Sequence, residues 1–191
     1  MDSISLFVNL ENEVKRSFAN VCWSHKIQIK EAEYLKSLSH WMDITLIALS
    51  SLIGIIGGWN MMFPRLRWRL ISLFLSAVLT GLTIFSKSSK FEERRQAHKQ
   101  AADSLWLIRE RYVSLIVDIH NQITSMGELM QRRDKLLKLT AEIYGKAPQT
   151  GRKAYEKTKN AIDAGETVFE DGEIERLLGI NLQGLSSSSD A

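Results

Sequence analysis

The sequence predicts an all-α protein: a two-span transmembrane helical hairpin with a membrane-proximal cytoplasmic helical bundle. Three observations lead to this fold class. Two windows without a charged residue, 44–63 and 70–86, flank a short basic loop. Apolar residues recur at helical spacing in the charged segments on either side of these windows. Only two prolines, Pro64 and Pro148, occur among 191 residues, so long helices are permitted almost everywhere.

The N-terminal segment, residues 1–40, is predicted to be an amphipathic helix. Its apolar residues fall on one side of the helix, and they are Leu10, Val14, Phe18, Val21 and Leu35. No basic segment precedes an early apolar run, so a cleavable signal peptide is not expected. The single cysteine, Cys22, excludes an intrachain disulfide and is typical of a reducing compartment.

Residues 41–86 are predicted to form the transmembrane hairpin, with spans of about 41–63 and 70–86. The first uncharged window has 20 residues, and at about 1.5 Å per residue it reaches roughly 30 Å, the thickness of a bilayer core. The second has 17 residues, the short end for a span. Tryptophans stand at the window ends, where their rings favour the headgroup layer: Trp41, Trp59 and Trp68. Two core helices of a soluble protein explain this pattern less well.

The charges that flank the spans predict the orientation. The outer flanks carry eight basic residues: Lys26, Lys30, Lys36, Lys87, Lys90, Arg94, Arg95 and Lys99. The loop between the spans carries three: Arg65, Arg67 and Arg69. This bias favours both termini in the cytoplasm, although the loop is itself densely basic. We therefore expect a multi-pass protein of the bacterial inner membrane.

Small residues recur at helical spacing in both spans, and we expect them to be helix-packing positions. They are Ser50, Gly54 and Gly58 in the first span and Ala77 and Gly81 in the second. Such ladders let helix backbones approach closely. They serve either to pack the two helices of one hairpin or to pack separate subunits of a homo-oligomer.

A stripe of hydroxyl side chains also follows one face of the second span. It consists of Ser72, Ser76, Thr80 and Thr83. In an oligomer such a stripe is a candidate lining for a water-filled pore. The alternative is that each hydroxyl bonds a carbonyl of its own helix. Neither span has an ionisable residue at mid-depth, which disfavours a proton relay or an ion-coupled transporter.

Residues 87–180 are predicted to be a cytoplasmic helical region that forms a bundle with the N-terminal helix. We expect a helix continuous with the second span from about Lys87 to Ser125. Its apolar seam is Leu105, Ile108, Tyr112, Leu115, Ile119, Ile123, Met126 and Met130. Gly127 is expected to interrupt this helix, and Gly145 to cap a second, shorter one. Thr150 is expected to cap a third helix near Arg152.

The C-terminal residues 181–191, which include a run of serines, are predicted to be a disordered tail.

Charge is distributed unevenly along the cytoplasmic region. Residues 87–159 hold 16 Lys and Arg against 9 Asp and Glu, whereas residues 160–191 hold 1 against 7. The basic helix face is a candidate site for an anionic signal, a nucleotide or a nucleic acid. Its residues are Arg94, Arg95, Lys99 and Arg109. The alternative partner for such a basic stretch is the anionic headgroups of the lipid bilayer.

The sequence lacks a recognisable catalytic or metal-binding pattern. No GxxxxGK[ST] and no GxGxxG phosphate loop occurs. The four histidines stand without HExxH or paired-cysteine spacing, so neither a metal site nor a cofactor is expected. Glu93 with His98, or Cys22 with His25, would be the places to look for a membrane-bound enzyme. We expect that the protein is not an enzyme.

Several strings resemble those of the SLATT family of bacterial two-span proteins. These strings are residues 90–102 (KFEERRQAHKQAA), 132–136 (RRDKL), 147–150 (APQT) and Ala154-Tyr155. The order of parts is similar too: an N-terminal helix, a hairpin and a long helix that leaves the membrane. The resemblance covers about residues 10–180.

The resemblance implies a membrane effector of prokaryotic conflict systems, which oligomerises and breaches the inner membrane when infection is detected. It also implies a separately encoded sensor or synthase as partner, either a nucleotide-signal enzyme or a reverse transcriptase, because this chain carries no such domain. The alternative function is a membrane-anchored scaffold that recruits a soluble nucleotide- or nucleic-acid-synthesising partner. Replacing Ser76 and Thr80 with leucine separates the two, since only a pore is expected to lose activity.

Overall fold

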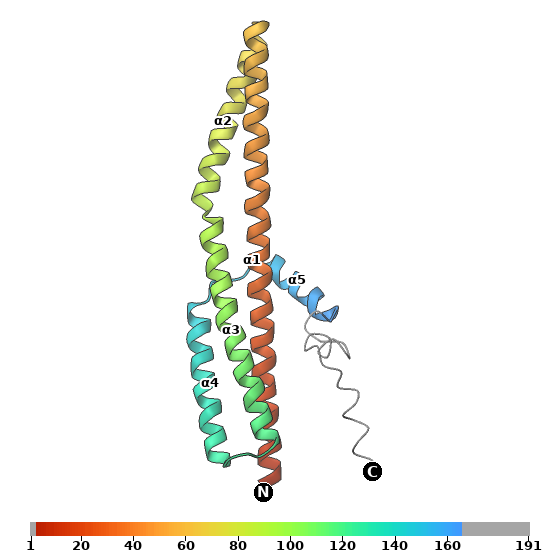
Figure 1. Cartoon of the computed structure of the whole chain (residues 1–191), viewed down its shortest axis with the longest axis vertical. Helices are drawn as coiled ribbons and strands as arrows, with labels where there is room; N and C mark the ends of the chain where they lie inside the picture. Colours follow the sequence, from red (N-terminus) through yellow and green to blue (C-terminus); the bar gives the residue numbers. More distant parts are fainter. Residues whose placement is uncertain (1–2, 166–191) are drawn as a thin grey trace, which may run out of the picture.

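The computed structural model describes residues 3–165, which form five helices and no strand (Figure 1). These helices are α1 (Ser3–Met62), α2 (Leu66–Ser89), α3 (Phe91–His120), α4 (Met126–Lys146) and α5 (Arg152–Asp163). The all-α class and the two-span hairpin are thereby confirmed. The predicted disordered tail, 181–191, lies outside the described residues.

Helix α1 joins the predicted N-terminal helix and the first span in one element of 60 residues. At 1.5 Å per residue it is about 90 Å long. It contains no proline, and its first glycine is Gly54, so nothing in the sequence interrupts it earlier. The predicted apolar side is confirmed, because Leu10, Val14, Val21 and Leu35 are buried and Phe18 packs against the core.

The hairpin of α1 and α2 extends beyond the other helices as a two-helix stalk (Figure 1). Helix α1 ends just before Pro64, which cannot continue a helix. In the turn, the backbone N–H of Arg65 donates to Oδ1 of Asn60 at 3.3 Å. Both α1 and the α2–α3 segment contain a stretch long and apolar enough to cross a membrane, and none of either stretch is buried inside the protein.

The periodicity predicts one helix that continues from the second span up to about Ser125. The structure differs, because this helix is broken at Lys90. Lys90 separates α2 from α3 in the left-handed region, with φ +47° and ψ +41°. This conformation costs a non-glycine residue about 1–2 kcal/mol. The break brings Phe91 into a buried position, where its ring lies 6.2 Å from that of Phe85. Burial of an aromatic ring offsets the backbone cost.

The turn between α3 and α4 falls before Gly127, not at it. Helix α3 ends at His120, and the chain reverses through Gln122, which has φ +49°. Ser125 caps α4, since its Oγ accepts the backbone N–H of Glu128 at 3.3 Å. Gly127 therefore lies in the first turn of α4, and the prediction that it interrupts a helix is wrong.

The far ends of α4 and α5 also differ from expectation. Gly145 lies inside α4, which continues to Lys146 and ends because Pro148 holds the preceding residue extended. Helix α5 begins at Arg152 as predicted, but Gly151 and not Thr150 is its N-cap, without a side-chain hydrogen bond.

The core lies where α1, α3 and α4 meet. Tyr112, Leu105, Ile119, Leu129 and Val14 are among its fully buried side chains. Helix α4 lies along α3, and α5 lies on the other side of α1 (Figure 1), where the rings of Trp23 and Tyr155 are 5.5 Å apart.

The predicted α3 seam is confirmed from Leu105 to Ile119, and Met126 packs against the core. Ile123 and Met130 are exposed, because the turn after His120 changes which residues face inward.

Candidate functional site

The small-residue ladders lie on the outer surface of the hairpin. All five residues are exposed: Ser50, Gly54, Gly58, Ala77 and Gly81. A Cβ atom added at Gly54, Gly58 or Gly81 would meet nothing within 4 Å. The residues of α1 that α2 covers are larger ones, such as Leu46, Leu49 and Ile53, which are half-buried. In the described chain, therefore, the ladders do not pack α1 against α2, and they stay open to another helix.

The hydroxyl stripe lies beside the seam between α1 and α2. Ser72, Ser76 and Thr83 are half-buried, and Thr80 is exposed. The hydroxyls of Ser76, Thr80 and Thr83 donate to carbonyls four residues back at 2.8, 2.9 and 2.8 Å. Their protons are therefore satisfied within the helix, while the oxygen lone pairs remain available as acceptors.

The four basic residues of α3 differ in how freely they face solvent. Arg94 and Lys99 are exposed. Arg95 forms a two-pronged ion pair with Glu92, which includes a 2.7 Å bond from its Nε. The hydrogen bond from Arg95, aided by one from Gln96, lowers the pKa of Glu92 to about 2.

Arg109 is likewise held by a carboxylate. Its Nε and Nη2 atoms donate to Oε1 of Glu110 at 3.0 and 2.7 Å. An anion at this face would meet Arg94 and Lys99 directly and would compete with carboxylates for Arg95 and Arg109.

A buried polar cluster that the sequence analysis missed ties three parts of the bundle together. His98 of α3 is 2% exposed, and its Nδ1 lies 2.6 Å from Oε1 of Gln28 on α1. The Nε2 of Gln28 donates to the carbonyl of Pro148 at 3.1 Å. Nearby on α1, the buried carboxylate of Glu31 accepts the backbone N–H of Gly151 at 2.9 Å.

Burial lowers the pKa of His98, since it disfavours the charged imidazolium, and the nearby carboxylate of Glu31 opposes this effect. The sequence did contain a signal for the cluster. Gln28 lies seven residues after the buried Val21 and seven before the buried Leu35, so a polar side chain stands on the apolar side of an amphipathic helix.

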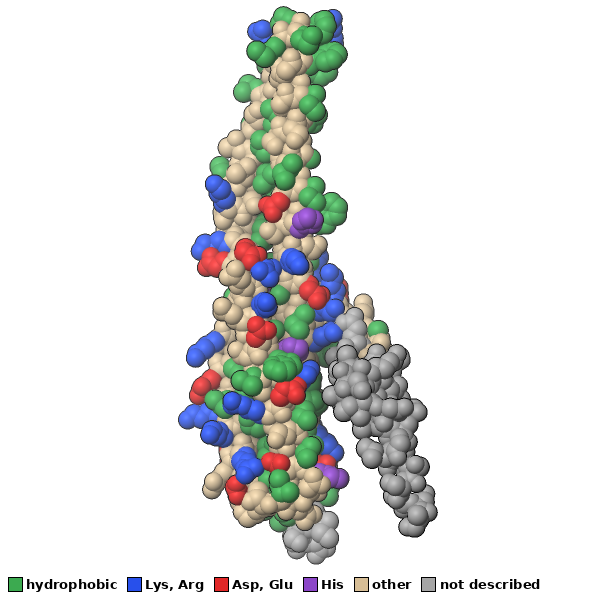
Figure 2. Space-filling model, in the orientation of Figure 1, with side chains coloured by type: hydrophobic (Ala, Val, Ile, Leu, Met, Phe, Trp, Pro, Cys, Tyr) green, Lys and Arg blue, Asp and Glu red, His purple; other side chains and the backbone are tan. Residues whose placement is uncertain are grey.

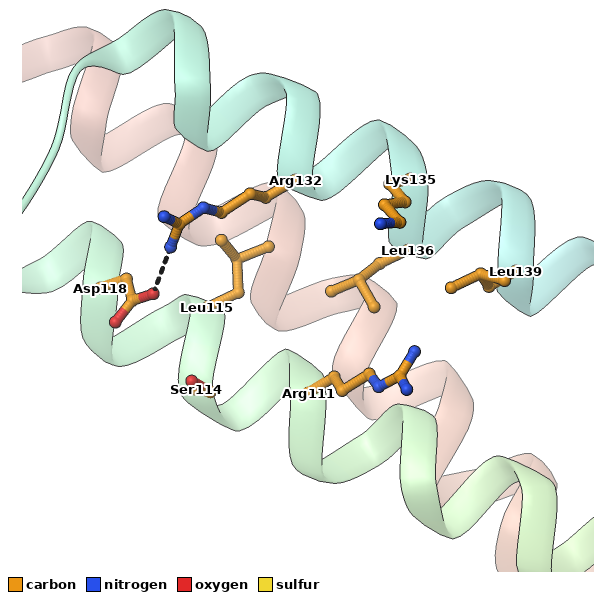
Figure 3. A pocket seen from close by; sticks show the side chains of 8 residues that line it. All are labelled: Arg111, Ser114, Leu115, Asp118, Arg132, Lys135, Leu136 and Leu139. Carbon is orange, nitrogen blue, oxygen red and sulfur yellow. Dashed lines mark hydrogen bonds and ion pairs between the residues drawn. The ribbon is translucent and has the colours of Figure 1, made fainter.

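A cavity of about 250 Å³ between α3 and α4 gathers basic side chains over an apolar floor (Figure 3). Arg111 reaches it from α3 and Lys135 from α4, above Leu115, Leu136 and Leu139. The sequence alone does not reveal this site. Its residues lie on two helices whose relative register depends on the turn at 121–125.

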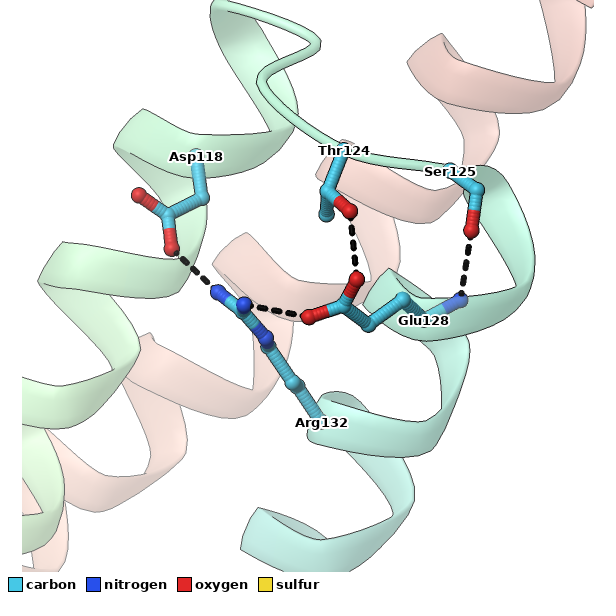
Figure 4. Close-up of polar contacts among 5 residues, drawn as sticks. All are labelled: Asp118, Thr124, Ser125, Glu128 and Arg132. Carbon is cyan, nitrogen blue, oxygen red and sulfur yellow. Dashed lines mark hydrogen bonds and ion pairs between the residues drawn. The ribbon is translucent and has the colours of Figure 1, made fainter.

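Arg132, at one end of this cavity, is held in place by two carboxylates (Figure 4). Its Nη1 donates to Oδ2 of Asp118 at 2.9 Å, and its Nη2 donates to Oε1 of Glu128 at 2.5 Å. Thr124 in turn donates to Glu128. The network fixes the α3–α4 turn, so Arg132 is less available to a ligand than Arg111 or Lys135.

The residues considered for nucleophilic chemistry do not activate one another. Burial raises the pKa of Cys22 and lowers that of His25. Both shifts favour the neutral forms, whereas a thiolate–imidazolium pair requires the charged ones. Among the described residues, no group of three or more His, Cys, Asp or Glu side chains is arranged to hold a metal ion.

Charged side chains cover the bundle, while most of the hairpin is free of them until its far end (Figure 2). Large apolar side chains on the hairpin surface are exposed, among them Ile47, Ile55, Leu73 and Phe74. Water is a poor solvent for such a surface and a bilayer is a good one. The fold and its surface define a two-span helical membrane protein.

A family model described as "SMODS and SLOG-associating 2TM effector domain family 4" matches residues 10–173. The chain belongs to this family, the SLATT family that the sequence resembles, and is a membrane effector of conflict systems. The family name links it to SMODS and SLOG proteins. Searches among curated proteins and among solved structures found no match.

Proposed function

We propose that the chain is the membrane effector of a bacterial antiphage, abortive-infection system, which oligomerises and permeabilises the inner membrane when a partner-derived signal arrives. The observation that carries the proposal is the uncovered small-residue face of the hairpin, above all Gly54 and Gly58 of α1. Membership in an effector family with two spans supports it.

Self-association follows from the physics of helices in lipid. Acyl chains are as apolar as leucine, so association of helices depends on close backbone packing. Gly54, Gly58 and Gly81 leave such an approach open on the outer surface of both spans. A second copy of the hairpin offers matching faces, and a symmetric ring of copies would close around a central path.

The hydroxyl stripe is the proposed lining of that path. Thr80 is exposed already in one protomer, and Ser72, Ser76 and Thr83 lie next to it along the seam. Their lone pairs would accept hydrogen bonds from water or solvate cations. The path opens only when copies assemble, because a single hairpin encloses no lumen.

The activating signal is proposed to be a nucleotide or nucleic acid that binds the basic face of α3, through Arg94 and Lys99 first. The signal comes from a separately encoded sensor or synthase. Helix α3 packs along α1 and connects to α2 through Lys90. A ligand that binds the assembled arrangement more tightly shifts the population toward it. Both termini would then lie in the cytoplasm with the signal.

The test is membrane potential in bacteria that express the chain, measured with a voltage dye and a large impermeant dye together. We expect depolarisation by the wild type and loss of it in Gly54→Leu/Gly58→Leu and in Ser76→Leu/Thr80→Leu. Ala48→Leu adds bulk at another exposed position of α1 and is expected to behave like the wild type. Membrane levels of all variants are matched first.

Depolarisation that persists in Gly54→Leu/Gly58→Leu would contradict the proposed mode of assembly. If the chain alone is silent, the same variants are compared during phage challenge together with the genomic neighbours. Equal protection by all variants under those conditions would exclude permeabilisation.

A second candidate function is a membrane-anchored scaffold, which the basic, apolar-floored cavity between α3 and α4 favours. A soluble nucleotide- or nucleic-acid-synthesising partner would dock there, and the hairpin would be only an anchor. This function predicts that Arg111→Glu/Lys135→Glu abolishes phage protection while both hairpin double variants retain it.

A further inference from the structure

The tip of the hairpin contains an apolar cavity of about 300 Å³. Ile55, Ile56 and Trp59 line it from α1, and Trp68 lines it from α2. The cavity is therefore formed by both spans at the end that lies farthest from the bundle (Figure 1). The mechanism proposed above makes no use of it.

Three arginines lie within three residues of Trp68, which lines this cavity, and no carboxylate is near them in the sequence. Arg65, Arg67 and Arg69 are all exposed, and two of them flank Trp68 in the sequence. No acidic residue occurs from Ile44 to Phe91. Asp43 is 22 residues before Arg65, which along a helix is about 33 Å away. Figure 2 shows Lys and Arg side chains reappearing at this end of the molecule, where no acidic side chain is visible.

The position of the tip selects the kind of molecule that can fill the cavity. In a two-span protein the turn lies at the membrane surface, and the tryptophan rings favour the headgroup level. Phospholipids surround this site at high local concentration. Arginine binds phosphate oxygens through paired N–H donors, and an apolar cavity next to it suits the first methylene groups of an acyl chain.

We propose that the hairpin tip binds an anionic phospholipid, with its phosphate at Arg65, Arg67 and Arg69 and its apolar part in the cavity between Trp59 and Trp68. A lipid with net negative charge is preferred over a zwitterionic one, because three uncompensated positive charges face it. The site does not depend on whether the hairpin permeabilises the membrane. The site also explains why the loop between the spans is basic, although the charge bias of the flanks places the termini and not the loop in the cytoplasm.

The two tryptophans that line the cavity make a direct experiment possible. In the full chain, Trp23, Trp41 and Trp106 are replaced by phenylalanine, which leaves Trp59 and Trp68 as reporters. The protein is reconstituted in two preparations of phosphatidylcholine vesicles. One contains a small fraction of phosphatidylglycerol with brominated acyl chains, and the other contains the same fraction of phosphatidylcholine with brominated acyl chains. Bromine quenches nearby tryptophan, so enrichment of one lipid at the tip is measured as stronger quenching.

We expect brominated phosphatidylglycerol to quench about threefold more strongly than brominated phosphatidylcholine. Arg65→Gln/Arg67→Gln/Arg69→Gln is expected to abolish this difference. Lys138→Gln/Lys146→Gln/Lys159→Gln removes the same charge from exposed positions of α4 and α5 and is expected to keep it. Circular dichroism and membrane incorporation establish that each variant is folded and inserted.

Equal quenching by the two lipids would overturn the proposal, and so would a preference that survives removal of the three arginines. Inorganic phosphate in excess distinguishes a lipid from a free phosphate as occupant. The lipid site predicts that the preference persists, whereas its loss would identify a site for free phosphate and overturn the assignment to lipid.

Discussion

At the scale of single residues, the cluster of His98, Gln28 and Glu31 shows how buried polar groups are accommodated in this bundle. Each has a partner, and two of the partners are backbone groups of the α4–α5 connection. A buried polar atom that loses its partner keeps the full cost of its desolvation. The cluster therefore holds α1, α3 and the connection in one relative arrangement.

Gln28→Ala is expected to destabilise the protein by about 1–3 kcal/mol, because it leaves His98 Nδ1 and the carbonyl of Pro148 without their partner. Chemical denaturation in detergent, monitored by circular dichroism, measures the change. His40→Ala, at an exposed position of α1, is the matched control and is expected to have little effect. An unchanged stability in Gln28→Ala would mean that water replaces the amide.

The lowered pKa of His98 predicts a pH dependence with a definite sign. Above pH 6.5, its ordinary pKa, the imidazole is neutral in both the folded and unfolded states. Below it, the unfolded state takes up a proton first, so the folded state loses stability as the pH falls. The pKa of half-buried His25 is lowered too, so His25 contributes a pH dependence of the same sign.

Unfolding of wild type and of His98→Asn, measured between pH 8 and pH 5, checks this prediction. The wild type is expected to lose more stability on acidification than the variant. Arg94 adds to the effect by disfavouring the charged imidazole, while Glu31 reduces it. A steeper loss in the variant would contradict a buried neutral histidine.

At the scale of elements, the long-range pattern was predictable and the interruptions were not. Charge-free windows and steps of three and four residues predict the hairpin and the buried sides of α1 and α3. Nothing at Lys90 marks a break, since it is neither glycine nor proline, and the break depends on where Phe91 packs. The start of α4 was readable, because Ser125 and Glu128 have the spacing of a capping box.

The same distinction applies to the candidate sites. The outward ladders consist of small residues at helical spacing, so the sequence alone reveals them. The His98 cluster depends on contacts between residues as much as 120 positions apart, and the α3–α4 cavity depends on how two different helices pack together. Periodicity within one helix does not determine which residue of another helix lies opposite.

The break at Lys90 predicts the sign of a glycine substitution. Lys90→Gly is expected to stabilise the protein by up to about 1 kcal/mol, because glycine adopts a positive φ without the steric cost. Thermal unfolding measures the shift. In an uninterrupted helix the same substitution would destabilise by about 1 kcal/mol. If Lys90→Gly destabilises the protein, the result would contradict the break at Lys90 and favour a continuous helix.

At the scale of the whole molecule, α1 connects the bundle to the tip of the hairpin without interruption. One side of it carries Leu10, Val14 and Val21 into the bundle core, and farther along it presents Gly54 and Gly58 outward. A change in how α3 packs on α1 is thus connected to the membrane through a single helix. This continuity is the physical route by which the proposed signal at the bundle would reach the proposed association of hairpins.

The most direct test of the central claim, association of hairpins through the small-residue face, is cysteine cross-linking between copies in the membrane. In a Cys22→Ser background, Ser50→Cys places a thiol on the ladder, and Ala48→Cys places one on another exposed side of α1. A disulfide forms only when the two Cα atoms come within about 7 Å. Both variants are oxidised in cells in which expression depolarises the membrane. Association through the small-residue face predicts covalent dimers for Ser50→Cys and far fewer for Ala48→Cys. Dimers of both variants in equal yield, or of Ala48→Cys alone, would contradict it.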